Sequence, residues 1–197
     1  MSPERPTRDQ AWELLCEYTK TDSLRKHALA VEAAMRASAR NLGEDEEAWG
    51  IVGLLHDFDY ERWPNATDHP HRGVEILAEK GYPEDWRRAI LGHASYTGVA
   101  RDSRMARALF AVDELSGFVI AVALVRPGKS LAEVDARAVR KKMKEKGFAR
   151  SVNRDEILQG AAELGVDFDQ HVAFVIGALL PVADQLGLAG GGAPPGT

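Results

Sequence analysis

The sequence is poor in cysteine, and this scarcity excludes two kinds of site. Cys16 is the single cysteine among 197 residues. The chain therefore cannot form an internal disulfide, and it cannot supply a cluster of thiolate metal ligands. The first ten residues, MSPERPTRDQ, lack the apolar core of a secretory signal. These features predict a cytoplasmic protein.

Long uncharged apolar runs and an excess of basic charge are missing as well. The longest apolar stretch, Met105 to Val125, contains Arg107, Asp113 and Glu114, which argues against a membrane span. The formal net charge is -5, so no global basic field is present to hold nucleic acid. A Walker loop, a dinucleotide fingerprint and a nucleophile elbow are also not found.

The composition that is present favours one compact helical domain. Hydrophobic residues make up 45% of the chain, which suits a single core that buries roughly two-thirds of the surface. Alternating runs of β-branched and aromatic residues are few, so strands have little support. We predict an all-α bundle of roughly six to eight helices around a central metal pocket. The expected domain covers residues 1–188, with a motif core at 22–124 and C-terminal helices at 130–188. The tail 189–197, AGGGAPPGT, is expected to be disordered.

Capping residues indicate where several helices begin and end. Thr21, Asp22 and Ser23 offer N-caps for a helix that runs to about Asn41. A long helix is predicted over about 103–125, before Pro127 and Gly128. Ser130 with Glu133 forms a capping-box pattern, which predicts the start of a strongly basic helix.

Four polar residues fall on the apolar faces of the predicted helices, by their three- and four-residue spacing from apolar neighbours. These residues are His27, His56, His93 and Asp113. A single inward histidine is usually a hydrogen-bonded core residue. An inward carboxylate costs several kcal/mol unless it meets a cation or a strong donor. One shared metal explains all four, and imidazole with carboxylate suits Fe, Mn, Co, Ni or Zn.

The order of these residues resembles the HD-domain superfamily of metal-dependent phosphohydrolases. The family pattern is a His, a His-Asp doublet behind an apolar helix, and a distal Asp. Here these are His27, His56-Asp57 in IVGLLHDFD, and Asp113 in LFAVDEL, and the resemblance covers about residues 22–124. It implies that these residues hold one or two divalent transition metals. It also implies hydrolysis of a phosphoester, either a nucleotide or a small phosphorylated metabolite, by a metal-activated water.

Many family members use two more histidines to hold a second metal. His69 and His93 are the candidates, because His69-Pro70 with Gly73 looks like the family's His-Pro-x-x-Gly helix start. His71 is the alternative to His69. In the two-metal arrangement Asp57 bridges the ions, and Asp57 or Asp59 orients the attacking water.

The chain departs from the family after the doublet, where many phosphohydrolases carry a lysine that holds phosphate. Phe58, Asp59 and Tyr60 follow the doublet here. Arg62 or Arg101 is expected to replace the lysine. Lys141, in the basic helix at 137–146, is a further candidate, although a solvated surface is the usual explanation of such a helix.

Two other functions remain open at this point. The first is an HD-type di-iron oxygenase that cleaves a small alcohol or phosphonate. The second is a metal-containing binding or sensor module without turnover. The expected partner is a small phosphorylated substrate, with no membrane and no indication of nucleic acid. Tyr60 and Tyr96 flank ligand positions, and they either line the pocket or pack beside it.

Overall fold

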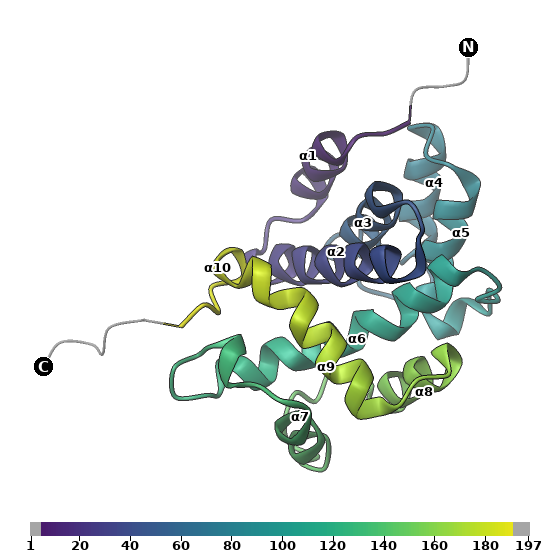
Figure 1. Ribbon diagram of the computed structural model, residues 1–197. Helices are drawn as coiled ribbons and strands as arrows, with labels where there is room; N and C mark the ends of the chain where they lie inside the picture. Colours follow the sequence, from purple (N-terminus) through teal and green to yellow (C-terminus); the bar gives the residue numbers. More distant parts are fainter. Residues whose placement is uncertain (1–4, 191–197) are drawn as a thin grey trace, which may run out of the picture.

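The computed structural model describes residues 5–190, and it confirms the all-α fold class (Figure 1). Within that range there is no strand, and a single isolated bridge joins Ser130 to Ala189. The α-helices are α1 (Arg8–Tyr18), α2 (Asp22–Leu42), α3 (Glu46–Leu55), α4 (His71–Glu79), α5 (Glu84–His93), α6 (Arg104–Leu124), α7 (Ala136–Met143), α8 (Arg154–Leu164), α9 (Phe168–Leu179) and α10 (Ala183–Leu186). Of the tail expected to be disordered, residues 191–197 lie outside the described range.

Side-chain caps explain why the central helices begin and end where they do. Asp45 accepts a hydrogen bond from the N–H of Ala48 at the start of α3, and Ser103 accepts one from Ala106 at the start of α6. Gly43 ends α2 with a φ of 70°, a conformation that glycine adopts at little cost. The predicted bounds of α2 and α6 are therefore confirmed to within about two residues.

Helices α2 and α6 form the centre of the molecule (Figure 1). α2 packs along α3 and also contacts α6, whereas α6 contacts α5, α8 and α9. Met35, Leu54 and Leu109 are fully buried where these helices meet. The polar residues predicted to face inward thus lie on elements that share one core.

The prediction that Ser130 starts the basic helix is wrong. Its hydroxyl accepts a hydrogen bond from Ala132, but it caps only a single 3-10 turn, Leu131–Glu133. The N–H of Leu131 is bound to the carbonyl of Leu188, so this turn is tied to the end of the fold. α7 begins later, with Asp135 as its capping residue.

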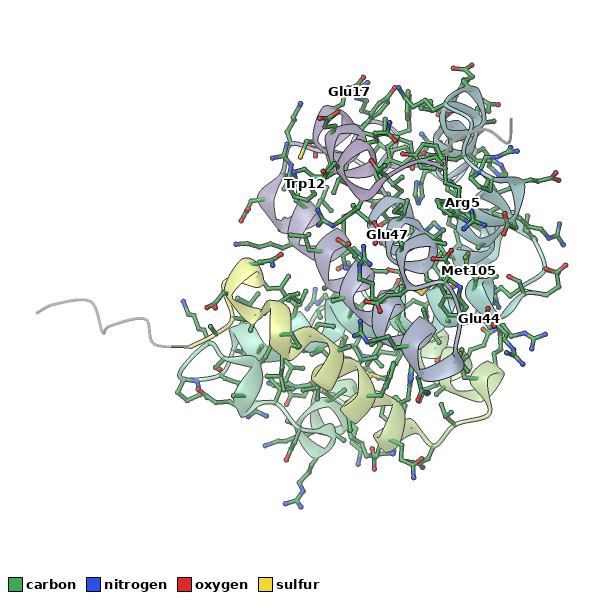
Figure 2. All side chains as sticks on the ribbon, turned by 45° about the horizontal axis from the view of Figure 1, so that its top comes forward. Arg5, Trp12, Glu17, Glu44, Glu47 and Met105 are labelled. Carbon is green, nitrogen blue, oxygen red and sulfur yellow. The ribbon has the colours of Figure 1, made fainter. Side chains whose placement is uncertain are left out.

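The start of the chain forms a helix that the sequence reasoning did not anticipate. Thr7 and Gln10 make a capping box at the start of α1. Figure 2 shows Trp12 and Glu17 on α1, and it shows Arg5 on the same side as Glu44 and Met105. Arg5 is paired with Asp45, the residue that caps α3, so residue 5 lies beside the start of that helix.

Within residues 5–190, no single helix is long and apolar enough to cross a membrane. α8 and the segment Phe168–Leu186 reach that length and hydropathy only together, as a pair bent by 98°.

Candidate metal centre

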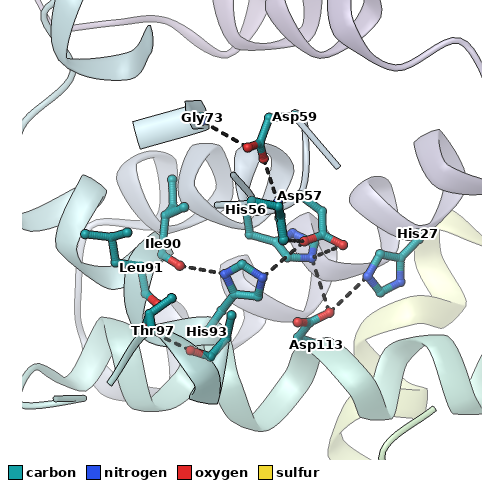
Figure 3. Close-up of polar contacts among 12 residues, drawn as sticks. His27, His56, Asp57, Asp59, Gly73, Ile90, Leu91, His93, Thr97 and Asp113 are labelled. Carbon is teal, nitrogen blue, oxygen red and sulfur yellow. Dashed lines mark hydrogen bonds and ion pairs between the residues drawn. The ribbon is translucent and has the colours of Figure 1, made fainter. Parts of the chain in front are cut away.

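Five segments of the chain bring their ligand-type side chains to one place (Figure 3). α2 supplies one histidine, the end of α3 supplies the doublet, and α5 ends on another histidine. The loop before α4 and the middle of α6 supply the rest. The residues are His27, His56, Asp57, His69, His93 and Asp113. The predicted set thus converges, with His69 in the cluster and His71 exposed at the start of α4.

The cluster divides into two groups that can each hold a metal ion. One consists of His27, His56 and Asp113, and the other of Asp57, His69 and His93. In each group the ligand atoms all lie within 4.8 Å of one another. Transition metals bind nitrogen and oxygen at about 2.0–2.2 Å, so two ligands of one ion stand up to about 4.4 Å apart. The carboxylate oxygen and the imidazole nitrogens of each group lie between 2.9 and 3.2 Å apart, inside this limit, so each group can hold a single ion.

Each group has one aspartate close to its two histidines, and Asp57 also reaches the other group. Asp113 Oδ1 lies 2.9 Å from His27 Nε2 and 3.2 Å from His56 Nε2. Asp57 Oδ1 lies 3.1 Å from the Nε2 atoms of both His69 and His93. The other oxygen of Asp57 is 3.7 Å from His56 Nε2, so this carboxylate reaches both groups.

Hydrogen bonds on the far side of the rings fix how the histidines face the cluster. Nδ1 of His56 is bound to the carbonyl of Gly53, and Nδ1 of His93 to that of Ile90. A carbonyl oxygen can only accept, so Nδ1 carries the proton in each ring. Nε2 of each ring faces the cluster, and it would present its lone pair there once it gives up its proton, as metal ligands do.

Asp59 orients His69 rather than water, which corrects the role predicted for it. Its carboxylate accepts hydrogen bonds from His69 Nδ1 at 2.8 Å and from the N–H of Gly73 at 3.0 Å. It is fully buried and does not line the cavity beside the cluster. A Cβ on residue 73 would stand 2.8 Å from this carboxylate, so the close approach requires glycine.

The cluster as it stands attracts positive charge. His56 Nε2 is buried and has no hydrogen-bond partner. Burial lowers the pKa of His56, but Asp113 and Asp57 outweigh it and raise this pKa to about 10. Burial likewise opposes ionisation of Asp57 and Asp113, yet the neighbouring imidazoles hold both pKa values below their usual range. Without metal, Nε2 of His56 therefore holds a proton that faces two carboxylates. A bound cation would take the place of this proton, and the nitrogen and oxygen donors fit a transition metal.

A cavity of about 410 Å³ borders the cluster. Besides the metal-ligand residues, its lining includes Tyr60, Tyr96, Glu114, Asn153 and Glu156. Burial, and then Asp113, raise the pKa of Glu114 to about 8. The tyrosines do line the pocket. The two glutamates were missed, although the place of Glu114 beside a ligand was a usable signal.

The cations predicted to bind substrate lie elsewhere. Arg62 donates to the carbonyl of Glu17 at 2.8 Å, and Arg101 is paired with Glu163 at 2.6 Å. Lys141 is exposed on α7. In the part of the chain that the structure describes, no lysine or arginine lines the cavity. The structure therefore does not bring these cations to the site.

Comparison with known proteins gives one match. The HD domain family model matches residues 24–117, a range that contains every residue of the metal cluster. No curated protein and no solved structure matches the chain. The matched range also contains α3, α5 and most of α2 and α6, the helices that carry the cluster. The fold, the order of the ligand residues and the family match agree, and residues 24–117 of this chain belong to the HD-domain superfamily.

Proposed function

We propose that this chain is a metal-dependent phosphohydrolase that acts on a phosphoester at the cluster. The observation that carries the proposal is the pair of three-residue groups joined by Asp57 beside a cavity. Two metal sites about 3.5–4 Å apart recur in phosphatases and nucleases, where they hold both the attacking and the leaving oxygen.

Each metal ion would have its own set of ligands. His27, His56 and Asp113 would hold one, while His69 and His93 would hold the other, and Asp57 would contribute to both. Bound divalent ions would polarise a phosphoryl oxygen and lower the pKa of water toward neutrality.

Asp57 is the residue placed to handle the attacking water. It lines the cavity, and its two oxygens face different histidines of the cluster. A carboxylate oxygen has more than one lone pair, so Asp57 can also accept a hydrogen bond from water and orient it. His56 Nε2 lies 3.7 Å from Asp57. The His56 ring is buried, and its Nδ1 donates to the carbonyl of Gly53, which fixes its orientation.

The cavity limits the size of the substrate. Small-molecule sites span about 300–1,000 Å³, and about 410 Å³ lies near the lower end of that range. This volume favours a small phosphorylated metabolite over a nucleotide.

A second candidate is an HD-type di-iron oxygenase acting on a small alcohol or phosphonate. The observation in its favour is that the described cavity lining has no lysine or arginine to meet phosphate. A set of histidines and carboxylates also suits iron.

A substrate panel run with and without oxygen separates the two candidates. We expect phosphate release from a phosphoester by protein loaded with Mn or Fe, at the same rate with and without oxygen. Asp57→Ala should abolish this release, and His71→Ala should not, because His71 is exposed outside the cluster. Oxygen uptake tied to substrate loss, with no phosphoester hydrolysed, would overturn the hydrolase proposal and favour the oxygenase.

A further inference from the structure

The wall of the cavity beyond the metal ligands is acidic and aromatic. Glu114 and Glu156 lie on it, and so do Tyr60 and Tyr96, which are 40% and 54% exposed. The described lining contains no lysine or arginine. A site that relied on the protein for anion binding would carry at least one such cation.

Two basic side chains on nearby elements are bound elsewhere. Arg101 forms a two-pronged pair with Glu163. Arg154, in the first turn of α8, donates to the carbonyls of Met143 and Val152, among others. Neither guanidinium lines the cavity, so neither faces its acidic wall.

The two glutamates are held by the contact between α6 and α8. The N–H of Asn153, the residue that caps α8, donates to Glu114 Oε2 at 3.2 Å. Glu156 lies in the first turn of α8 and also lines the cavity. Both residues thus lie beside the space that a substrate enters, and the carboxyl of Glu114 is held there by a hydrogen bond.

Counting charges shows that the site does not lack negative charge even when metal is bound. Two divalent ions would bring four positive charges. Asp57, Asp59, Asp113 and Glu156 together carry up to four negative charges, which balance the ions. Glu114, whose pKa is raised by burial and by Asp113, would gain a fifth when a cation binds beside it. An additional anionic group away from the ions would meet repulsion, whereas a cationic group would be attracted.

We propose that the substrate carries an ammonium group, which binds between Glu114, Glu156 and the two tyrosine rings. Carboxylates form strong charge-assisted contacts with ammonium groups, and aromatic faces attract cations within about 6 Å. The inference rests on the proposed function only for the phosphoryl end of the substrate. The substrate class is then a small zwitterionic phosphoester, with its phosphoryl group at the cluster and its ammonium group at the acidic wall.

Calorimetric binding of simple alcohols tests the ammonium site without any turnover. The probes are choline and ethanolamine, each compared with an uncharged alcohol of the same shape, 3,3-dimethylbutan-1-ol and propan-1-ol. The protein is loaded with Mn and kept at low ionic strength, since salt screens partly exposed charges. We expect at least one charged probe to bind about tenfold more tightly than its uncharged partner.

Two variants in the first turn of α8 test whether Glu156 causes the preference for the charged probe. Glu156→Gln should remove most of the preference for the charged probe. Asp155→Asn removes an equal charge from an exposed neighbour outside the cavity lining, and it should keep the preference.

Equal binding of charged and uncharged probes by the unchanged protein would overturn the inference. A preference that Glu156→Gln and Glu114→Gln both leave intact would overturn it too. If the preference holds while no phosphoester is hydrolysed, the proposed function fails and the ammonium site stands.

Discussion

At the scale of single residues, the hydrogen bonds made by Nδ1 of the ligand histidines determine how each ring is oriented toward the metal cluster. Nδ1 of His69 is bound to a buried carboxylate, whereas those of His56 and His93 are bound to backbone carbonyls. A carboxylate behind a histidine fixes its ring and raises its basicity as a ligand. Asp59 is therefore a positioning residue for His69.

Asp59→Asn should weaken metal binding without touching the cavity. The amide cannot serve both His69 and the N–H of Gly73 as an acceptor in the way the carboxylate does. Loss of such a partner typically costs about 10–100-fold in metal affinity. Competition with a coloured chelator measures this change. Asp68→Asn is the matched control, because Asp68 is on the same loop but bonds Asn65 and Arg72. Equal affinities for both variants would contradict the role of Asp59.

His171 gives a dependence of stability on pH that is separate from the metal ligands. It is buried on α9, and Nε2 donates to the carbonyl of Ala111. Burial lowers its pKa in the folded state, below an unfolded value of about 6.5. Its contribution is therefore fully present above about pH 6.5 and is lost as the pH falls toward the folded pKa.

His171→Gln should reveal this loss, because glutamine does not titrate. With metal removed from both proteins, we expect the stability of the unchanged protein relative to this variant to decrease between pH 7.5 and 5.5. Urea unfolding at a series of pH values measures the difference. A difference that stays constant over this interval would show that His171 does not titrate on unfolding.

At the scale of elements, α8 reaches the cavity because it packs closely on α6. A Cβ on Gly160 would stand 2.6 Å from the Cα of Ala111, so an added side chain would clash with the backbone of α6. We expect Gly160→Ala to lower the free energy of unfolding by about 1–3 kcal/mol, the usual cost of overpacking a core.

Gly177→Ala is the matched change on α9. Nothing lies within 4 Å of the Cβ it would add, and the position is exposed within the helix. This variant should gain about 0.5–1 kcal/mol, because alanine favours helix over glycine. Urea unfolding of both variants measures the opposite signs. Stabilisation by Gly160→Ala would contradict the close contact of α6 and α8.

Local patterns predicted the helices that carry the ligands, but not every boundary. Apolar spacing and end signals placed α2 and α6. The prediction of a helix start at Ser130 failed, because the turn that follows it is bound to Leu188. A contact so distant in the sequence leaves no local signal. The acidic wall was missed for the same reason, since Glu156 meets Glu114 only through the packing of α8 on α6.

At the scale of the whole molecule, the metal centre joins α2, α3, α5, α6 and the loop before α4. His27, His56, His93 and Asp113 were predictable because each lies at helical spacing from apolar neighbours, which fixes the direction of its side chain. Asp57 and His69 were predicted only from the family resemblance. The direction of long side chains was not predictable in this way. Arg62 follows the doublet closely, yet its guanidinium turns outward to Glu17 and to the ring of Tyr18.

Because the ligands join so many elements, removing metal should destabilise the entire fold. Metal at a hundred to a thousand times its dissociation constant would stabilise the folded state by about 3–4 kcal/mol. For a chain of this size each kcal/mol corresponds to about 2–4 °C in Tm. Chelation should therefore lower Tm by several degrees, and added Mn should restore it. An unchanged melting curve after verified metal removal would count against a buried metal.

Metal content tests the central claim most directly, because the claim is that the two groups of ligands hold ions. Elemental analysis of freshly purified protein should find close to two ions per chain, drawn from Fe, Mn, Co, Ni or Zn. Asp57→Ala should lose most of this metal, because Asp57 reaches both groups, and His71→Ala should keep it. Protein that contains no transition metal and takes up none, or an Asp57→Ala variant with unchanged metal content, would contradict the account.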